Sequence, residues 1–530
     1  MVLRGKQSSL AQLGLVVAPA FVLFGYNQAG IGGLLSVKDW TETFPEIDTV
    51  HVTGAVKMQH SLVQGTTVAT FVLGALVGAL SCIFTGDIFG RRKLIFGGAL
   101  LTFVGEALCC TSFGLAQFIV GRTIIGMGVG ILSATVPVWQ AECSDAKHRG
   151  KHVVLDGLFI SFGYVLESWI NLGFFQIKTG SVSWRLPLAL PTVVSLLLMA
   201  SIFSMPESPR WLVRVGKTDE ARRNLAILND VEETSAVVNL AIAGIEHNVE
   251  EMKEQGLGLK DCFKSGPDKL FYRFTLCILL QFYQQMSGSN LISVYAPIIF
   301  QEGLKLDSQT SRILSAGALT WKFLSCFVAF FTIDRFGRRA LFLVSGIGMG
   351  CCMLSLAIAT SMPEDNKAAS IASVFFIFMF NFFVPIGFLG ANFLYCAEIA
   401  PLSLRVAMSS VSTANHWLWN FVVAMVTPTA INELGYKYYI LYCVISFCIP
   451  LSVFFFYPET MGQSLEQIDS MFKDNDSIFA VVKQSIKQSK RTPNIPVDEK
   501  GDIIASHAEK VDAEKGMSSA SDSDEISAKE

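Results

Sequence analysis

The chain has 530 residues, of which 51% are hydrophobic and 16% are charged, and its formal net charge is −3. Soluble domains carry about 25% charged residues, so this composition excludes an ordinary soluble protein and indicates a polytopic membrane protein in contact with the lipid bilayer. The 12 cysteines are scattered without paired spacing, so we expect no disulfide framework, no metal site and no cofactor.

Apolar runs long enough to cross a bilayer as helices recur along the whole chain. We expect twelve spans, near residues 13–35, 65–85, 94–112, 116–139, 152–174, 185–205, 270–300, 311–333, 340–361, 370–396, 407–430 and 437–457. A hydrophilic insert separates the sixth span from the seventh. The predicted fold is therefore an all-α integral membrane protein with twelve transmembrane helices in two pseudo-symmetric six-helix bundles.

The polar segments complete the expected domain organisation. We expect a cytoplasmic N-terminus at 1–12, an N-terminal bundle at 13–205, a cytoplasmic helical linker at 206–269, a C-terminal bundle at 270–457 and a cytoplasmic tail at 458–530. From Asp474 onward the tail is polar and charged, and such a composition cannot bury a core. We expect this tail to be largely disordered.

Basic residues at the span ends predict the orientation. They gather on one side, for example at Arg91, Arg92 and Lys93 and in the linker, whereas the other side mixes basic with acidic residues. By the positive-inside rule the first side is cytoplasmic, which places both termini in the cytoplasm. No cleavable signal peptide is evident before the first span.

The two halves repeat one pattern. Gly86-Asp87-Ile-Phe-Gly90-Arg91-Arg92 follows the second span, and Ile333-Asp334-Arg-Phe-Gly337-Arg338-Arg339 follows the eighth. An acid and an arginine also follow the fourth and tenth spans, and such duplication is typical of transporters built from parallel repeats. We expect cytoplasmic latches that favour one access state, formed by Asp87, Arg91, Glu142, Arg149, Asp334, Arg338, Glu398 and Arg405.

The seventh span contains the stretch Gln281-Phe-Tyr-Gln-Gln-Met-Ser-Gly-Ser-Asn290 within an otherwise apolar run. Amides buried in a bilayer are costly unless they find partners. Gln281, Gln285 and Ser289 recur every four residues and would share one helix face. One interpretation is hydrogen bonding between helices alone; the other, which we favour, is a hydrated cavity that binds a neutral, hydroxyl-rich solute.

A set of motifs resembles the sugar porter family of the major facilitator superfamily, in its fungal branch. The matching segments are Gly86-Asp-x-x-Gly-Arg-Arg92, Gly121-Arg122, Pro137-x-x-x-Ala-Glu142 with Arg149-Gly150, Pro206-Glu-Ser-Pro-Arg-Trp211, Gln284-Gln-x-x-Gly-x-Asn290, Asp334-x-x-Gly-Arg-Arg339 and Pro458-Glu-Thr460. The resemblance extends from about Gly25 to Asp469. It implies a hexose-like site between the halves and transport by alternating access.

The resemblance also assigns site residues. It implies that Gln284, Gln285 and Asn290 bind sugar hydroxyls, and that Trp417 and Asn420 of the eleventh span close the cavity from below. An indole face suits the C–H side of a pyranose, whereas amides bind its hydroxyls. His416 is interpreted as a packed neighbour rather than a proton carrier.

Four features depart from the family pattern. Gly157 stands where the fifth span usually has a sugar-binding glutamine, and the tenth span lacks the usual tryptophan and prolines. Asn27 stands where proton-coupled sugar porters commonly have an aspartate. Because an asparagine does not titrate, Asn27 favours facilitated diffusion, and we expect it among the substrate-binding residues. Acidic residues elsewhere in the spans could still bind protons, so proton-coupled transport stays open as the alternative.

The fourth departure is Lys322, a cation near the middle of the eighth span, where the family usually has a neutral polar residue. An ammonium at the bilayer centre costs ~3 kcal/mol on insertion scales, so it should face the interior and be paired. We expect an intramembrane charge pair with Glu167 of the fifth span. The alternative is a cation that binds an anionic substrate such as a sugar acid.

The sequence thus predicts a monomeric, multi-pass plasma-membrane transporter of a carbohydrate, moving its solute into the cell. The alternatives are a sugar-acid or polyol transporter with proton coupling, and a nutrient receptor that binds without transport. No nucleophile–base or metal-ligand spacing is present, so we expect no enzyme and no catalytic residue. The near-zero net charge gives no reason to expect a nucleic-acid partner.

Overall fold

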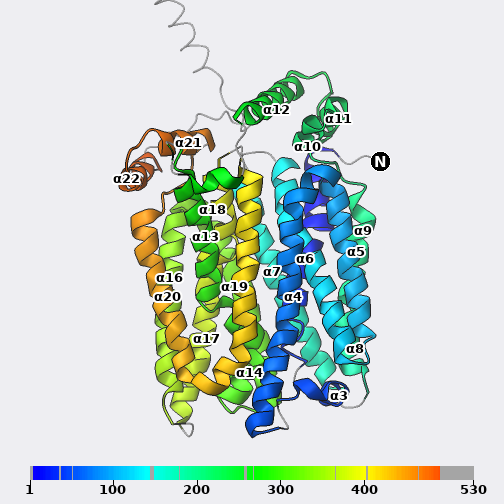
Figure 1. Ribbon diagram of the computed structural model, residues 1–530, viewed down its shortest axis with the longest axis vertical. Helices are drawn as coiled ribbons and strands as arrows, with labels where there is room; N and C mark the ends of the chain where they lie inside the picture. The colour runs from blue at the N-terminus through cyan, green and yellow to red at the C-terminus, as the bar shows by residue number, and fades with distance from the viewer. Residues whose placement is uncertain are drawn as a thin grey trace, which may run out of the picture.

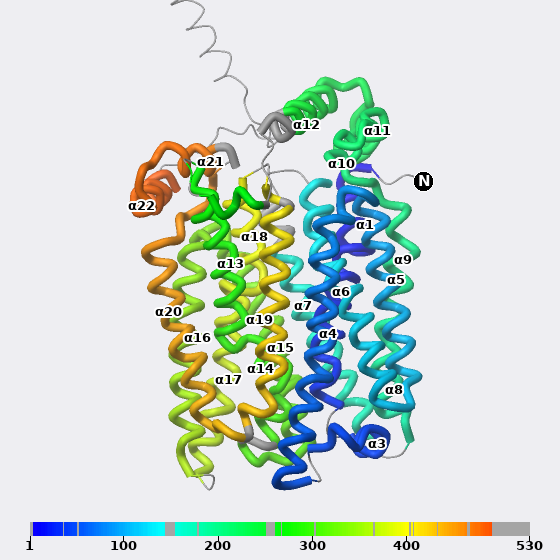
Figure 2. Tube along the Cα trace, viewed as in Figure 1, coloured from blue at the N-terminus to red at the C-terminus, as the bar shows by residue number. Residues whose placement is uncertain are grey.

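The structure is a computed structural model that describes residues 4–34, 37–49, 52–143, 149–177, 180–255, 259–264, 266, 268–363, 366–401, 404–463 and 465–489. Every regular element in these residues is helical. The helices stand roughly parallel as two neighbouring bundles, with the shorter helices at one end (Figures 1 and 2).

The first bundle contains six helical spans. They are α1 with η1 and α2 (Gly5–Gln12, Leu13–Val17, Ala18–Ala29), α4 (Gly54–Phe89), α5 (Arg91–Cys110), α6 (Leu115–Cys143), α7 (Arg149–Phe175), and α8 with α9 (Val182–Ala189, Pro191–Ile202). Two short elements, α3 (Lys38–Thr43) and η2 (Pro45–Ile47), lie between the first and second spans.

The second bundle repeats this arrangement. Its spans are α13 with α14 and η5 (Leu270–Met286, Ser289–Ile298, Ile299–Gly303), α15 (Ser308–Phe336), α16 (Arg338–Thr360), α17 with α18 (Lys367–Phe388, Ala391–Ile399), α19 (Arg405–Leu434) and α20 (Tyr436–Phe456). The described residues thus form the predicted twelve spans in two sets of six.

Length and hydropathy alone identify ten of these spans in the described residues as able to cross a membrane. The other two are the polar ones. In the seventh span, α13 and α14 are separate helices of 17 and 10 residues. The helix α19 is 30 residues long but carries Asn415, His416 and Asn420 in its middle. The exceptions to the apolar pattern are therefore the helices that supply the candidate site.

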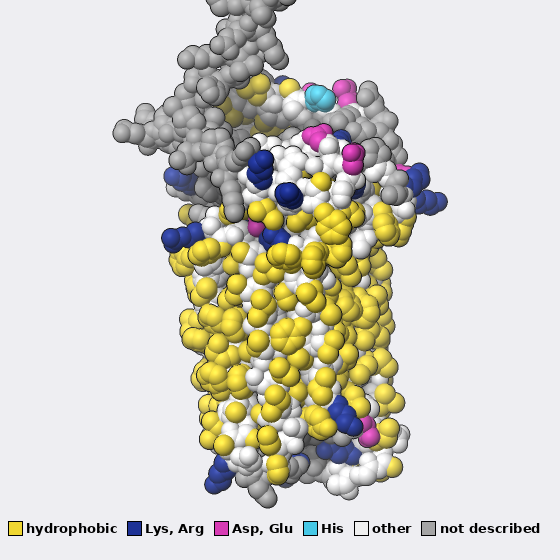
Figure 3. Space-filling model, turned by 90° about the vertical axis from the view of Figure 1, so that its left-hand side faces the viewer, with side chains coloured by type: hydrophobic (Ala, Val, Ile, Leu, Met, Phe, Trp, Pro, Cys, Tyr) yellow, Lys and Arg dark blue, Asp and Glu magenta, His cyan; other side chains and the backbone are white. Residues whose placement is uncertain are grey.

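The two bundles contact one another along two seams. The helix α4 packs along α19, and α7 packs along α15. On the face that Figure 3 shows, hydrophobic side chains cover the middle of the molecule, with lysine and arginine near its two ends. A lipid-facing surface of this kind surrounds an interior in which the polar groups must find partners in the protein.

The linker forms α10 (Pro209–Arg214), α11 (Thr218–Asn229), α12 (Ala236–Gln255) and η4 (Leu259–Phe263), at the same end as the N-terminus (Figure 1). Two further helices, α21 (Leu465–Lys473) and α22 (Ile478–Ser489), lie at this end beside the second bundle.

The expectation of disorder from Asp474 onward is wrong for the first part of the tail. In α22, Val481 and Val482 are buried, and Ser485 Oγ accepts a hydrogen bond from the backbone of Glu459 at 2.9 Å. An amphipathic helix can bury its apolar face on a neighbouring domain even when its overall composition is polar. Residues 490–530 lie outside the described part of the chain.

Candidate functional site

The seventh span is interrupted in the middle of its polar stretch. Gly288 separates α13 from α14 and has a φ of +95°. A Cβ at this position would lie 2.5 Å from Met353 Cε. The positive φ therefore favours a glycine here, whereas the end of the flexible Met353 side chain could move to admit a Cβ. The break places amide side chains at the facing ends of two helices, an arrangement that transporters use for substrate sites.

Four side chains from three helices form an amide cluster beside this break. Asn392 Nδ2 donates to Gln284 Oε1 at 2.7 Å and to Gln281 Oε1 at 3.1 Å. His416 Nδ1 lies 2.8 Å from Gln284 Oε1, which makes Nδ1 the protonated nitrogen in this arrangement. All four side chains are less than 5% exposed. The interpretation of His416 as a packed neighbour agrees with its place inside this cluster.

The cluster continues across the break and reaches the first bundle. Gln285 Nε2 lies 3.1 Å from His416 Nε2, and Asn290 Nδ2 donates to Gln285 Oε1 at 2.5 Å. Tyr164 of α7 donates its hydroxyl to Asn290 Oδ1 at 3.4 Å. The structure thus brings together Gln284, Gln285 and Asn290, and places them against the opposite bundle.

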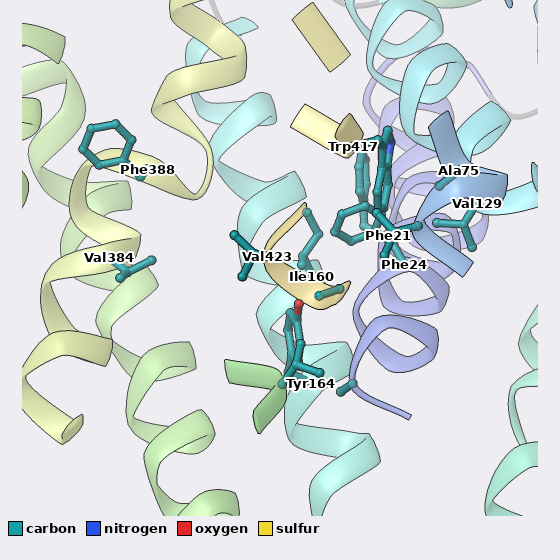
Figure 4. Close-up of a cluster of buried hydrophobic side chains, with 14 of the residues drawn as sticks. Phe21, Phe24, Ala75, Val129, Ile160, Tyr164, Val384, Phe388, Trp417 and Val423 are labelled. Atoms are coloured by element: carbon teal, nitrogen blue, oxygen red, sulfur yellow. The ribbon is translucent and has the colours of Figure 1, made fainter. Parts of the chain in front are cut away.

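An aromatic wall adjoins the amide cluster. Trp417 is fully buried, packs edge-on against Phe24 of α2 with ring centroids 5.0 Å apart, and lies 6.1 Å from the ring of Phe71 of α4. Its Nε1 donates to Ser133 Oγ of α6 at 3.3 Å. Figure 4 shows Trp417 beside Phe21 and Phe24. A tryptophan from the second bundle therefore contacts three helices of the first.

The space next to the cluster is almost closed. A cavity of about 10 Å³ is lined by residues of both bundles, among them Gln28, Arg122, Asn290 and Asn420. Asn420 Nδ2 is buried there without a hydrogen-bond partner in the described structure. Such a volume holds about one water molecule, so a sugar can enter only if the bundles separate.

Asn27 turns away from the amide cluster. Its Nδ2 donates to Glu106 Oε1 at 2.9 Å and to Leu23 O at 3.1 Å, and Ser195 donates to the other oxygen of Glu106 at 2.9 Å. The backbone carbonyl of Asn27 accepts from Arg122 Nη1 at 2.9 Å. In this conformation the Asn27 side chain therefore ties together helices of the first bundle instead of lining the cluster.

The expected ion pair between Lys322 and Glu167 is not formed. Lys322 Nζ donates to Ser293 Oγ of α14 at 2.8 Å, whereas Glu167 Oε1 accepts from Asn171. Glu167 also lines a small cavity with Arg312. The depth of a residue in a span follows from its sequence position, but the direction of its side chain depends on the packing of the helices. Here Lys322 bonds to Ser293 and Glu167 bonds to Asn171.

Gly157 marks a very close approach between the bundles. A Cβ at this position of α7 would lie 2.4 Å from the carbonyl oxygen of Leu389, and 2.9 Å from its carbonyl carbon. Leu389 lies at the break between α17 and α18. Because both obstructing atoms belong to the backbone, no side chain fits here in this conformation. The departure from a glutamine at this position therefore has a steric reason.

The predicted acidic and basic residues of the first bundle meet at the end of the bundle that carries the linker. Arg91 Nε and Nη2 donate to the two oxygens of Glu142 at 3.0 and 3.2 Å, and Arg91 Nη1 donates to Gly86 O at 2.9 Å. Asp87 lies 3.7 Å from Arg91 and pairs with Arg214 of α10 at 2.7 Å. The result is a forked ion pair between α5 and α6, extended to the linker.

The second bundle contains the matching set. Arg338 Nη2 donates to Glu398 Oε1 at 3.0 Å, and Arg338 Nη1 lies 3.5 Å from Asp334 Oδ1. Arg405 donates to the carbonyl of Ala400 at 3.4 Å. The Arg149 side chain lies outside the described part of the structure. These ion pairs join helices within one bundle, so any latch acts by shaping each bundle as a unit.

We call the ion pairs around Arg91 and around Arg338 the two ion-pair frames. Glu207 and Glu459, to which the sequence analysis gave no role, complete them. Glu207 accepts hydrogen bonds from the first two backbone N–H groups of α5 at 3.2 and 3.1 Å, and Glu459 does the same for α16 at 3.0 and 3.1 Å. Both sit at helix N-termini, where negative charge is favourable. Burial raises the pKa of Glu207, opposed by these donors, so acidification weakens this contact.

The signal for these carboxylates was present as a Pro-Glu pair after the sixth and the twelfth span. The roles of Asn392, Tyr164 and Ser293 had no comparable signal. Each lies on a different helix from its partner, and nothing in the local sequence indicates which helices will meet.

Comparison with known proteins gives a consistent picture. Residues 13–472 match the family model described as sugar (and other) transporter. The sugar transporter STL1 of Saccharomyces cerevisiae is 34% identical over 456 residues, which cover 85% of this chain and 79% of that protein. The high-affinity glucose transporter of Kluyveromyces lactis is 28% identical over 550 residues, covering 96% and 94%.

Solved structures share the fold. The proton:xylose symporter XylE, bound to 6-bromo-6-deoxy-D-glucose, superposes with a TM-score of 0.74 at 23% identity, covering 88% of this chain and 100% of that one. A partially occluded, inward-open form of XylE from E. coli superposes with a TM-score of 0.70 at 22% identity. At this level of identity the likeness concerns the architecture of the two bundles.

Proposed function

The chain belongs to the sugar porter family of the major facilitator superfamily, and from this premise we propose that it moves a sugar or sugar-like solute between its two bundles by alternating access. The protein is a multi-pass membrane transporter and not an enzyme. The observation that carries the proposal is the amide cluster at the broken seventh span, buried at the contact between the bundles.

The proposed binding site combines amides with an indole. Asn290 now bonds to Gln285, and Gln284 and Gln285 each bond to His416. A solute would replace these internal hydrogen bonds with bonds to its own hydroxyl groups. Asn420 has a buried N–H without a partner in the described structure and can donate to a hydroxyl oxygen. Trp417 supplies an apolar face for the C–H side of a ring.

Access to this site requires movement of whole bundles. The cavity of about 10 Å³ is too small for a sugar, and backbone contacts between α7 and the α17–α18 break close one side. The ion-pair frames at Arg91 and Arg338 hold the helix ends of each bundle together. We propose that each bundle moves as a rigid unit, with these frames preserving its shape.

The cellular setting is part of the proposal. The basic side of the molecule, with the linker and α21–α22, faces the cytoplasm by the positive-inside rule, which places both termini there. We propose the plasma membrane as the location, uptake as the direction, a monomer as the working unit and a belt of lipid around the hydrophobic surface (Figure 3).

Proton coupling is a second candidate for one specific reason. Asn27 cannot titrate, yet it holds the fully buried carboxyl group of Glu106 at 2.9 Å. An acid is therefore present in the first bundle beside the position where proton-coupled relatives carry theirs. Coupling through Glu106 would make uptake sensitive to a protonophore, whereas facilitated diffusion would not.

Uptake by cells that express the full chain tests the proposed function. The panel should include glucose, galactose, a disaccharide, glycerol and galacturonate, each with and without a protonophore. We expect saturable uptake of at least one polyhydroxylated solute. Binding without flux would favour a receptor, and the absence of both would contradict the proposal.

Replacing Gln285 with alanine should weaken substrate binding. Removing one amide from a buried, ligand-satisfied network costs ~1–3 kcal/mol, so the half-saturation concentration should rise about fivefold or more. The matched control is Asn381→Ala. Asn381 is equally buried, but among the described residues its side chain bonds only to Ile377 O of its own helix. An unchanged half-saturation concentration for Gln285→Ala would place the site elsewhere.

A further inference from the structure

Resting on the proposed function, we propose that Lys322 determines the specificity of the site, and that the preferred solute carries a carboxylate beside its hydroxyl groups. The chemical class is a polyhydroxylated acid, such as a uronic or aldonic acid. The inference follows from the position of Lys322. It is a buried cation beside the amide cluster, and it has no carboxylate partner among the described residues.

Lys322 lies inside the protein with its hydrogen-bonding capacity mostly unused. Its side chain belongs to a residue that is 1% exposed. The ammonium donates to Ser293 Oγ at 2.8 Å and lies 5.0 Å from the ring centroid of Tyr164. No carboxylate of the described residues lies within 4.0 Å of it. An ammonium has three N–H donors, and a hydroxyl with one ring face does not neutralise its charge.

The nearest acid of the facing helix is engaged elsewhere. Glu167 accepts from Asn171 on its own helix and shares a small cavity with Arg312 and Ser293. Ser293 therefore contacts Lys322 and also lines that cavity. Among the described residues, Glu167 forms no ion pair with Lys322, and the serine hydroxyl holds the ammonium instead.

Lys322 is continuous with the proposed binding site through Tyr164. The ring of Tyr164 lies under the ammonium, and its hydroxyl donates to Asn290. A solute bonded to Asn290 and Gln285 would therefore lie next to the lysine.

A second cation with unused donors borders the same site from the first bundle. Arg122 is 1% exposed, and its Nε and Nη2 have no partner in the described structure. It lines the same cavity as Asn290 and Asn420. Two buried cations thus flank the amides, one from each bundle. In a medium of low dielectric constant, a carboxylate between them would be attracted far more strongly than a neutral hydroxyl.

Direct binding to the purified full-length protein tests this inference. The three probes are galacturonate, the methyl ester of galacturonic acid and galactose, which share the same ring and differ in charge. We expect wild-type protein to bind galacturonate about tenfold or more tightly than the ester. This comparison needs no substitution, so it holds even if a variant fails to fold.

Substitutions then assign the preference to Lys322. Lys322→Gln should lower the affinity for galacturonate to that for the ester, whereas Lys322→Arg should retain the preference for galacturonate. The control Lys367→Gln, at an exposed position, should change neither affinity. Equal or tighter binding of the ester to wild-type protein overturns the inference, as does a preference that survives Lys322→Gln. Transport of neutral sugars without binding of galacturonate overturns it while leaving the proposed function intact. Absence of any solute transport would instead refute the proposed function.

Discussion

Gly157→Leu is expected to abolish transport almost completely while the protein remains folded in the membrane. A Cβ at this position would lie 2.4 Å from the carbonyl oxygen of Leu389, and the remaining leucine atoms would add to the overlap. Backbone atoms cannot rotate away, so the two bundles cannot come together here. A transporter that cannot close one side cannot complete its cycle, and we expect uptake to fall about tenfold or more.

Gly173→Leu is the matched control, since Gly173 lies on the same helix and a Cβ added to it would meet no neighbouring atom within 4 Å among the described residues. The comparison uses initial uptake rates, normalised to the amount of protein in the membrane. Near-normal transport by Gly173→Leu with loss in Gly157→Leu supports closure at this contact. Equal rates for the two variants would show that the contact is not part of the transport cycle.

Arg91→Met should produce the second large effect, a loss of stability of about 3–5 kcal/mol, because it strands Glu142. The side chains of Arg91 and Glu142 are only 6% and 11% exposed, and their closest contact is 3.0 Å. Removing both charges together, as Arg91→Met with Glu142→Gln, should recover part of the loss. Thermal unfolding of the purified variants measures both effects.

An exposed pair in the same region provides the control. Arg214 contacts Asp87 at 2.7 Å, but their side chains are 45% and 40% exposed. Surface ion pairs contribute little, so Arg214→Met should change the unfolding temperature far less than Arg91→Met. A double variant no more stable than Arg91→Met would contradict the account of the frame as a buried ion pair.

Much of the fold could be predicted because a bilayer constrains helices by length and hydropathy. The spans and the division at the linker follow from this rule. The interruption of the seventh span at Gly288 did not, since a Ser-Gly pair within an apolar run is also compatible with a continuous helix. The order of α22 was missed because it depends on burial of Val481 in a cluster with Ile468, Met471 and Phe472 of α21.

The candidate site was predictable only in part. The amides of the seventh span were recognisable as polar groups in an apolar run, and the structure gathers them in one cluster. Their partners Asn392 and His416 come from other helices, so their meeting depends on packing. For the same reason the partner expected for Lys322 was wrong: Glu167 lies in the facing helix, but Ser293 occupies the contact.

The most direct test of the central claim is counterflow of labelled solute into liposomes that contain only the purified protein. The solute should be the one with the highest uptake in the cellular panel, and the comparison should be wild-type protein against a variant carrying Gln285→Ala and Asn290→Ala. We predict rapid, saturable accumulation by wild-type protein and a strongly reduced rate in the variant. Counterflow that is absent from wild-type liposomes, or that is identical in the variant, would contradict transport through the amide cluster.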